Sequence, residues 1–173
     1  MRASYGLLGV AAAALAGCAV MAVGSEFSPS ADFAAYRTFG WDAGEPEPTG
    51  NALLDNSPFF DARVREAVDG ELVGKGLVSS TDEPHLLLHY HFSVERQVDV
   101  YRVDADLGYE SSERQASEWD EGTLVIGLAD AGKRIVWRGW AKVDVTGVLG
   151  NQERLGARIH EAVGKIFERY PPG

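Results

Sequence analysis

The sequence predicts one α+β domain, a two-layer sandwich in which two helices cover one face of a mostly antiparallel sheet. Several segments alternate apolar and polar residues, which is the period of a strand with one buried face. Two other segments repeat apolar residues every three or four positions, which is typical of amphipathic helices. The elements follow one another in an order close to ββαβββα, and short connections favour the two-layer arrangement.

The predicted domain begins with two short strands and a loop. The segment from Met21 to Phe27 predicts a first strand, which ends at Ser28-Pro29-Ser30. Residues 36–41, YRTFGW, alternate aromatic and polar positions and predict a second strand. We interpret Asp42–Asn56 as a loop, because glycine and proline recur along it.

The first predicted helix opens at Ser57-Pro58. Serine is a favoured N-cap, and proline is favoured at the first helical position. Gly74-Lys75-Gly76 ends the helix. Its apolar stripe consists of Phe60, Val64, Ala67, Val68 and Leu72.

Three further strands and a second helix complete the domain. His85–Val94 alternates as a half-buried strand, whereas residues 96–118 are polar and predict either a variable excursion or a ragged extension of that strand. Thr123–Ala129 and Arg134–Val145 form a hairpin around a tight turn. After a linker at 147–151, the last helix carries an apolar stripe and ends at Pro171-Pro172. The stripe consists of Leu155, Ile159, Val163, Ile166 and Tyr170.

The amino-terminal residues have the pattern of a secretory leader. Arg2 is followed by an uncharged run from Tyr5 to Leu15, too short to span a bilayer comfortably. Leu15-Ala16-Gly17-Cys18 then resembles the lipobox of bacterial lipoproteins. This resemblance implies cleavage between Gly17 and Cys18, with diacylglycerol on the Cys18 sulfur. We therefore expect a leader at 1–17, a lipidated tether at 18–20 and one domain at 21–172.

The predicted lipid also suggests a location. Two or three acyl chains hold a protein at a membrane without help from its surface. Ala19 follows the cysteine where some inner-membrane lipoproteins carry Asp, so the resemblance favours the outer membrane and an orientation facing the periplasm. The formal net charge of −10 makes nucleic acid an unfavourable partner. With a single cysteine, the chain forms no intrachain disulfide.

Six segments, in order and spacing, resemble a bacterial lipoprotein family catalogued only as a domain of unknown function, number four-one-three-six. The resemblance covers residues 20 to 172 and implies a periplasm-facing α+β domain without an agreed activity. It names no catalytic residues, and His85 departs from the family, which more often has Asp there. The segments are 36–39 with Trp41, 84–91, 121–126, 136–139, 162–167 and 170–172.

Three histidines offer the one candidate metal site. His85, His89 and His91 share one face of a predicted strand, where two imidazoles at i and i+2 are able to share a metal. Further ligands are not specified, so we interpret all three as outward polar residues and expect no metal and no cofactor. The sequence has no Gly-x-Ser-x-Gly elbow, and its acidic residues isolate no acid–base pair. We therefore expect no enzyme.

The favoured function is a membrane-anchored envelope protein whose domain binds another envelope protein or itself. The alternatives are a small-ligand or metal-binding periplasmic module and an unrecognised hydrolase. In the strand 134–145, one set of alternate residues is almost wholly apolar and should face the helices. Trp137 belongs to this set. We expect Arg138, Trp140, Val136 and Val125 on an open sheet face, as a candidate interaction surface. Alternatively, residues 96–118 fold across this face and Trp140 is core.

Overall fold

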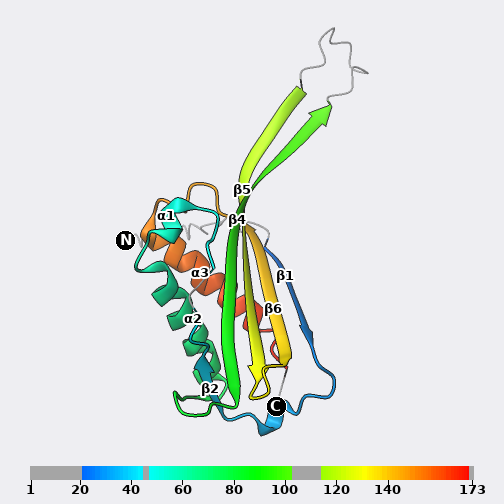
Figure 1. Cartoon of the computed structure of the whole chain (residues 1–173). Helices are drawn as coiled ribbons and strands as arrows, with labels where there is room; N and C mark the ends of the chain where they lie inside the picture. Colours follow the sequence, from blue (N-terminus) through cyan, green and yellow to red (C-terminus); the bar gives the residue numbers. More distant parts are fainter. Residues whose placement is uncertain (1–20, 45–46, 103–113, 172–173) are drawn as a thin grey trace, which may run out of the picture.

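The alternating segments form one six-stranded sheet in the order β1-β6-β5-β4-β2-β3. The computed structural model describes residues 21–44, 47–102 and 114–171 (Figure 1). Strands β1, β6, β5 and β4 are antiparallel neighbours, whereas β2 runs parallel to β4 and β3. The predicted fold class is confirmed, with a parallel edge added. The strands are β1 (Ala22–Phe27), β2 (Thr38–Trp41), β3 (Val78–Ser79), β4 (Leu86–Arg102), β5 (Arg114–Asp130) and β6 (Ile135–Asp144).

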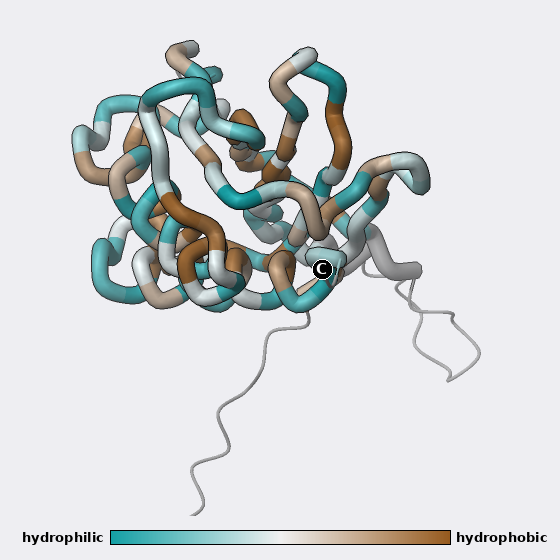
Figure 2. Tube along the Cα trace, turned by 90° about the horizontal axis from the view of Figure 1, so that it is seen from below, coloured by the Kyte–Doolittle hydropathy of each residue, from teal (hydrophilic) through white to brown (hydrophobic). Residues whose placement is uncertain are grey.

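The helices α2 (Phe60–Gly74) and α3 (Gln152–Phe167) lie together against one face of the sheet (Figure 1). The core lies between these two layers, where Trp137 and Phe167 stack with ring centroids 5.4 Å apart. Figure 2 shows that hydrophobic residues occur in short stretches separated by hydrophilic ones, the pattern expected of amphipathic elements. Among the described helices, none has the length and apolar character needed to cross a membrane.

The start of α2 differs from the prediction. The helix begins at Phe60, after a turn, and its N-cap residue is Phe59, whose side chain has no capping group. Ser57 contributes its backbone carbonyl, which accepts from the Phe60 N–H at 3.4 Å. Phe60 is buried, and its ring packs against that of Phe92 with the ring centroids 5.2 Å apart. The helix therefore begins where Phe60 enters the core rather than at the best capping residue.

The predicted loop 42–56 contains a short helix, α1 (Ala52–Asp55). The side chain of Asn51 caps it by accepting from the Leu53 N–H at 3.0 Å. Leu54 is buried in the core and holds the helix against the domain. A three-residue 3-10 turn, η1 (Phe33–Ala35), connects β1 to β2. Neither element was predicted.

Strands β4 and β5 continue past the rest of the sheet as a two-stranded ribbon. Their register runs from Leu86 opposite Asp130 to Arg102 opposite Arg114. Strand β6 ends at Asp144, opposite Glu121. Figure 1 shows the two strands projecting beyond the body of the domain. Of the two alternatives for residues 96–118, the strand extension is correct for 96–102 and 114–118, and residues 103–113 lie outside the described structure.

Candidate functional site

The sheet face opposite α2 and α3 is the candidate interaction surface, and the strand register fixes which residues share it. We call it the open face. Outward residues of β4, β5, β6 and β1 stand side by side in three cross-strand rows. The rows are His91, Val125, Trp140 and Gly24; His89, Gly127, Arg138 and Glu26; and Ser93, Thr123, Lys142 and Ala22.

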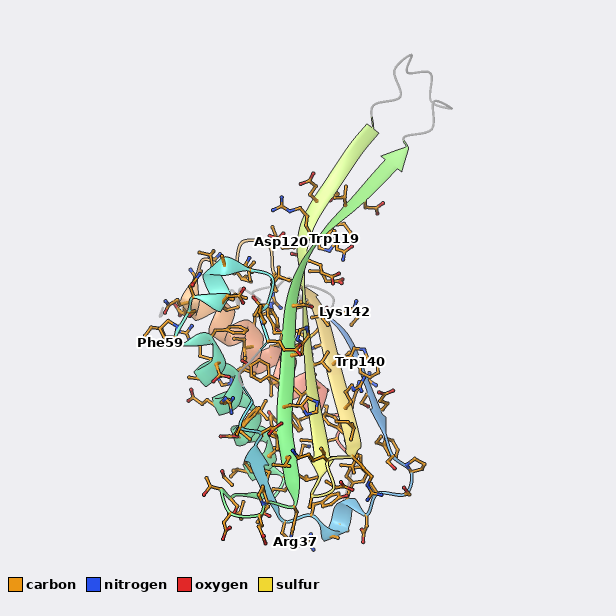
Figure 3. All side chains as sticks on the ribbon, in the orientation of Figure 1. Arg37, Phe59, Trp119, Asp120, Trp140 and Lys142 are labelled. Carbon is orange, nitrogen blue, oxygen red and sulfur yellow. The ribbon has the colours of Figure 1, made fainter. Side chains whose placement is uncertain are left out.

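The two tryptophans of β6 have the exposures that the alternation predicts. Trp137 is 0% exposed and packs against α3, whereas Trp140 is half-buried on the open face. The Trp140 indole lies over Gly24 of β1, where an added Cβ would overlap the ring. Figure 3 shows Trp140 and Lys142 along the strand beside β1. Trp140 thus covers part of the edge strand and leaves the rest of its ring exposed.

Charged side chains of both signs surround Trp140. Arg138 lies 3.5 Å from Glu26 with 46% of its side chain exposed. Lys142 lies 3.3 Å from Glu121. Exposed pairs of this kind contribute little to folding stability. Their geometry nevertheless places cations on both sides of an aromatic ring, and tryptophan and arginine are the residues most enriched at binding hot spots.

One predicted member of this surface was assigned wrongly. Val136 is buried, at 5% exposure, while Ile135 is exposed. The β5–β6 register shifts between Leu128 and Ala129, which pair with Trp137 and Ile135, so Val136 is an extra residue in β6. Such a bulge reverses the alternation of a strand. Val125, beyond the bulge, remains on the open face and is half-buried.

The three histidines lie on β4 or just before it but have different neighbours. Nδ1 of His85 accepts from the Arg37 N–H at 3.1 Å, which places a ring proton on its Nε2. The His89 ring lies over Gly127, where a Cβ would overlap it. Burial lowers the pKa of His89, and the Arg138 charge lowers it further. Nδ1 of His91 is shielded from solvent and lies 3.0 Å from Oε2 of Glu47, without the alignment of a hydrogen bond.

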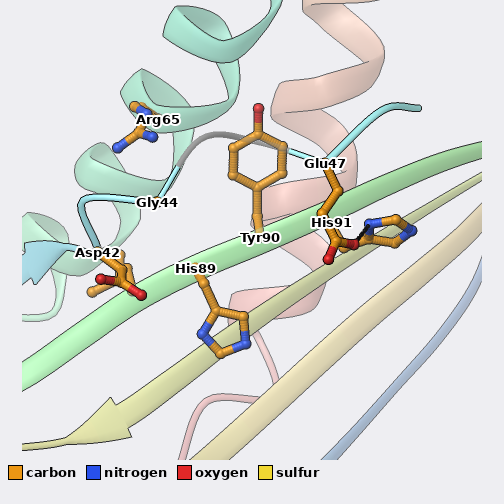
Figure 4. A pocket seen from close by; sticks show the side chains of 8 residues that line it. Asp42, Gly44, Glu47, Arg65, His89, Tyr90 and His91 are labelled. Carbon is orange, nitrogen blue, oxygen red and sulfur yellow. Dashed lines mark ion pairs between the residues drawn. The ribbon is translucent and has the colours of Figure 1, made fainter. Parts of the chain in front are cut away.

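A pocket of about 210 Å³ opens at the edge of β4, where β2 ends (Figure 4). Sequence reasoning missed it, because its walls come from β4, α2 and the chain after β2. It brings His89 and His91 together with acidic side chains from that chain, but leaves His85 outside. Within the described ranges, no group of three or more His, Cys, Asp or Glu residues has the geometry for a metal ion. The lining residues are Asp42, Gly44, Glu47, Arg65, Leu88, His89, Tyr90 and His91.

Polar groups that line this pocket are paired with others behind it. The Tyr90 hydroxyl donates to Oδ1 of Asp61 at 2.9 Å, and burial, followed by this hydrogen bond, raises the Tyr90 pKa far above its usual range. Arg65 binds the same carboxylate at 2.8 Å and lies 4.5 Å from the ring centre of Trp41. Nε1 of Trp41 donates to Asp69 at 2.8 Å. This network ties α2 to the sheet edge and presents no activated nucleophile.

The sequence matches the family DUF4136, described as a domain of unknown function, over residues 23–172. The chain belongs to this family. No curated protein matches the sequence. The family resemblance that the sequence segments suggested is therefore confirmed over residues 23–172. The family has no assigned activity.

Solved structures are similar to this DUF4136 domain at low sequence identity. A PDZ domain protein from Parabacteroides distasonis is similar with a TM-score of 0.56 and 15% identity over 88% of this chain, but the chain spans only 36% of that structure. The PelC dodecamer from Paraburkholderia phytofirmans has a TM-score of 0.46 and 11% identity, with coverage of 85% and 94% of the two chains. A neuraminyllactose-binding hemagglutinin homolog from Helicobacter pylori has a TM-score of 0.44 and 14% identity, with coverage of 79% of this chain and 84% of that one. The first of these likenesses shows the fold alone.

The DUF4136 domain has a second concavity at the end opposite the ribbon. This groove, of about 700 Å³, lies between η1 and the ends of α2 and α3. Its Tyr170 hydroxyl is shielded from solvent and has no hydrogen-bond partner among the described residues. Burial raises the Tyr170 pKa to about 12. Arg37 and Lys75 also line the groove, and Nζ of Lys75 lies 5.9 Å from the Tyr170 ring centre.

Proposed function

We propose that this DUF4136 chain is a lipid-anchored, non-enzymatic protein of the bacterial cell envelope that binds another envelope protein through the open face. The observation that carries the proposal is Trp140, a half-buried aromatic side chain flanked by Arg138 and Lys142 on a sheet face that the two long helices leave uncovered. An aromatic ring with flanking cations suits a protein partner better than a solvated surface.

The sequence around Cys18 supports the anchor, although this residue lies outside the described structure. The run Leu15-Ala16-Gly17-Cys18 follows an uncharged leader. Strand β1 begins at Ala22, only four residues after the cysteine. A lipid on Cys18 would therefore hold the domain close to the membrane, and we propose the periplasmic side of the outer membrane.

The non-enzymatic role is supported by the chemistry of the pocket at the β4 edge. Its volume of about 210 Å³ is below the roughly 300–1,000 Å³ typical of small-molecule sites. Tyr90 is held protonated, and its hydroxyl is committed to Asp61. Arg65 is committed to the same carboxylate. These groups stabilise the junction of α2 and β4 instead of meeting a substrate.

A site-specific photocrosslinker tests the proposal in intact envelopes. We expect a crosslinker at Lys142 to give a discrete adduct with another protein, and the same group at Val73 of α2, 56% exposed, to give none. Trp140→Ala should reduce the adduct from position 142 at least several-fold while the domain stays folded by circular dichroism. The same adduct from both positions, or one that Trp140→Ala leaves unchanged, contradicts the proposal.

The alternative function, small-ligand binding, is favoured by the groove at the opposite end. It combines an unpartnered Tyr170 hydroxyl with two cations, Arg37 and Lys75, that form no ion pair within the described chain. A ligand with an anionic group would pair with both cations. Isothermal titration calorimetry with inorganic phosphate and with benzoate tests this alternative. Saturable binding heat that Lys75→Gln abolishes would support it.

A further inference from the structure

The two-stranded ribbon of β4 and β5, which we call the arm, comprises Arg96–Arg102 and Arg114–Asp120. These segments pair with each other along their full length. In the described sheet no third strand accompanies them, because β6 ends opposite Glu121. A two-stranded ribbon is marginally stable alone in water, so an arm of this kind gains from a surface to rest on.

The arm leaves the sheet at the end where β1 begins. One cross-strand row joins Ala22, the first residue of β1, through Lys142 and Thr123 to Ser93 of β4. The base of the arm, Arg96, lies three residues beyond Ser93. The chain that leads back toward Cys18 and the strands that form the arm thus depart from the same end of the domain.

From this shared row, the arm reaches farther than the tether. Nine residue steps separate Ser93 from Arg102, about 30 Å at the rise of a strand. Four steps separate Ala22 from Cys18, at most about 14 Å when fully extended. A domain whose strands stood upright on the membrane would push the end of the arm about 15 Å past the lipidated residue. That depth exceeds the headgroup layer, which is about 5–8 Å thick on each side of a bilayer.

The end of the arm makes that upright orientation unfavourable. Arg102 and Arg114 lie opposite each other at this end, about 15 Å past the lipidated residue. Asp99 and Glu118, which are exposed, lie nearer the base and would reach only the headgroup layer. Charged side chains are costly in the hydrocarbon region. The arm also carries residues suited to the interface, because Val98 is 54% exposed and Trp119 is half-buried at the base (Figure 3). Tryptophan is enriched at membrane–water boundaries.

We infer that the domain lies tilted and that the arm rests in the phospholipid headgroup layer of the membrane that holds Cys18. The inference rests on the proposed lipid anchor. Contact with headgroups gives the lone ribbon a second surface, and the tilt keeps its charges out of the hydrocarbon. Figure 1 shows the arm leaning away from the long axis of the sheet, which lessens the tilt required. Residues 103–113 form no part of the proposed contact.

Fluorescence quenching in vesicles tests the inference on the full lipidated chain. The Cys18 thiol is consumed by lipid, so Val98→Cys offers a single site for a bimane label. Lys133→Cys, in the turn at the opposite end of the domain, is the matched control. Both proteins are reconstituted in phosphatidylcholine vesicles carrying a nitroxide either on the headgroup or deep in the acyl chain.

We expect the headgroup nitroxide to quench the label at position 98 at least threefold more than the label at 133, and the deep nitroxide to quench neither strongly. Equal quenching at both positions overturns the inference, as does strong deep quenching at 98. A label at 98 that is shielded from aqueous iodide but not quenched by lipid nitroxide means that a second copy covers the arm, which also overturns it. Flotation separates the two proposals, because protein that fails to float with vesicles refutes the anchor itself.

Discussion

The indole of Trp140 occupies the space that a Cβ on Gly24 would need, so this half-buried aromatic residue of the open face rests on the backbone of the edge strand. This contact joins β6 to β1 through a side chain as well as through the backbone ladder. It also fixes the ring on the surface without burying it. A rigid, half-exposed aromatic side chain loses little conformational entropy when a partner binds.

Gly24→Ala should therefore destabilise the domain by about 1–3 kcal/mol, because the new methyl group forces the Trp140 ring out of place. Gly70→Ala in α2 is the control. Nothing lies near a Cβ there, and alanine is the better helix former, so this change should stabilise by about 0.5–1 kcal/mol. Urea unfolding measures both. Equal effects of the two changes would contradict the contact.

Tyr170→Phe should leave the free energy of unfolding unchanged or raise it by up to about 1 kcal/mol. The hydroxyl that it removes is shielded and has no partner among the described residues. Tyr90→Phe removes a hydroxyl that donates to Asp61 at 2.9 Å and should cost about 1 kcal/mol or more. Thermal melts of the two variants compare the same chemical change at two sites. A larger loss at Tyr170 would show that its hydroxyl has a partner.

The pKa of His89 should lie below its usual value of about 6.5, because burial and the Arg138 charge disfavour the imidazolium. The unfolded chain then binds a proton more readily than the folded one below about pH 6.5. Stability that is present above this pH is therefore lost as the pH falls through the folded pKa. Titration by NMR measures the His89 pKa directly. Arg138→Gln should raise it, and a pKa at or above 6.5 in the unaltered protein is the contrary result.

Chelation should not change the melting temperature. A structural metal would contribute folding free energy, and its removal would lower Tm by several degrees. Each histidine instead has a protein neighbour. The His85 ring accepts from a backbone N–H, the His89 ring lies over a glycine, and the His91 ring lies beside a carboxylate. Melting with and without EDTA is the measurement. A fall in Tm that Zn²⁺ reverses would restore the metal-binding alternative.

Cys18→Ser should abolish lipid attachment and leave the leader uncut, because serine lacks the thiolate that accepts diacylglycerol. Labelling cells with radioactive palmitate, followed by fractionation, compares the two proteins. The altered protein should carry no label and should migrate as the longer precursor. Equal label in both proteins would contradict the anchor.

The sequence predicts the layers of this domain well because its strands and helices are amphipathic. Alternation alone places Trp137 in the core and Trp140 on the open face. It fails at Val136, because the bulge there depends on how β6 pairs with β5 and on the Ser28 N–H that donates to the Val136 carbonyl. Alternation carries no information about an extra residue. A local signal was present for α1, since Asn51 precedes a helix-forming triplet, Ala52-Leu53-Leu54.

The candidate sites were harder to predict than the fold. The residues of the open face follow from the alternation along each strand once the strand partners are known. The pocket at the β4 edge does not, because Asp42, Arg65 and Tyr90 come from three elements whose packing no local pattern encodes. The unpartnered hydroxyl of Tyr170 has no sequence signal either. In the sequence it is simply the last residue of an apolar helical stripe.

The position of β1 in the sheet also constrains when the domain is able to assemble. Strands β4, β5 and β6 pair as successive neighbours, so their contacts are local and form early. Ala22 instead pairs with Lys142, 120 residues later in the chain. During synthesis the first strand must therefore remain unpaired until nearly the whole chain has emerged. Its exposed edge is then vulnerable to pairing with other chains, a hazard that holdase chaperones relieve.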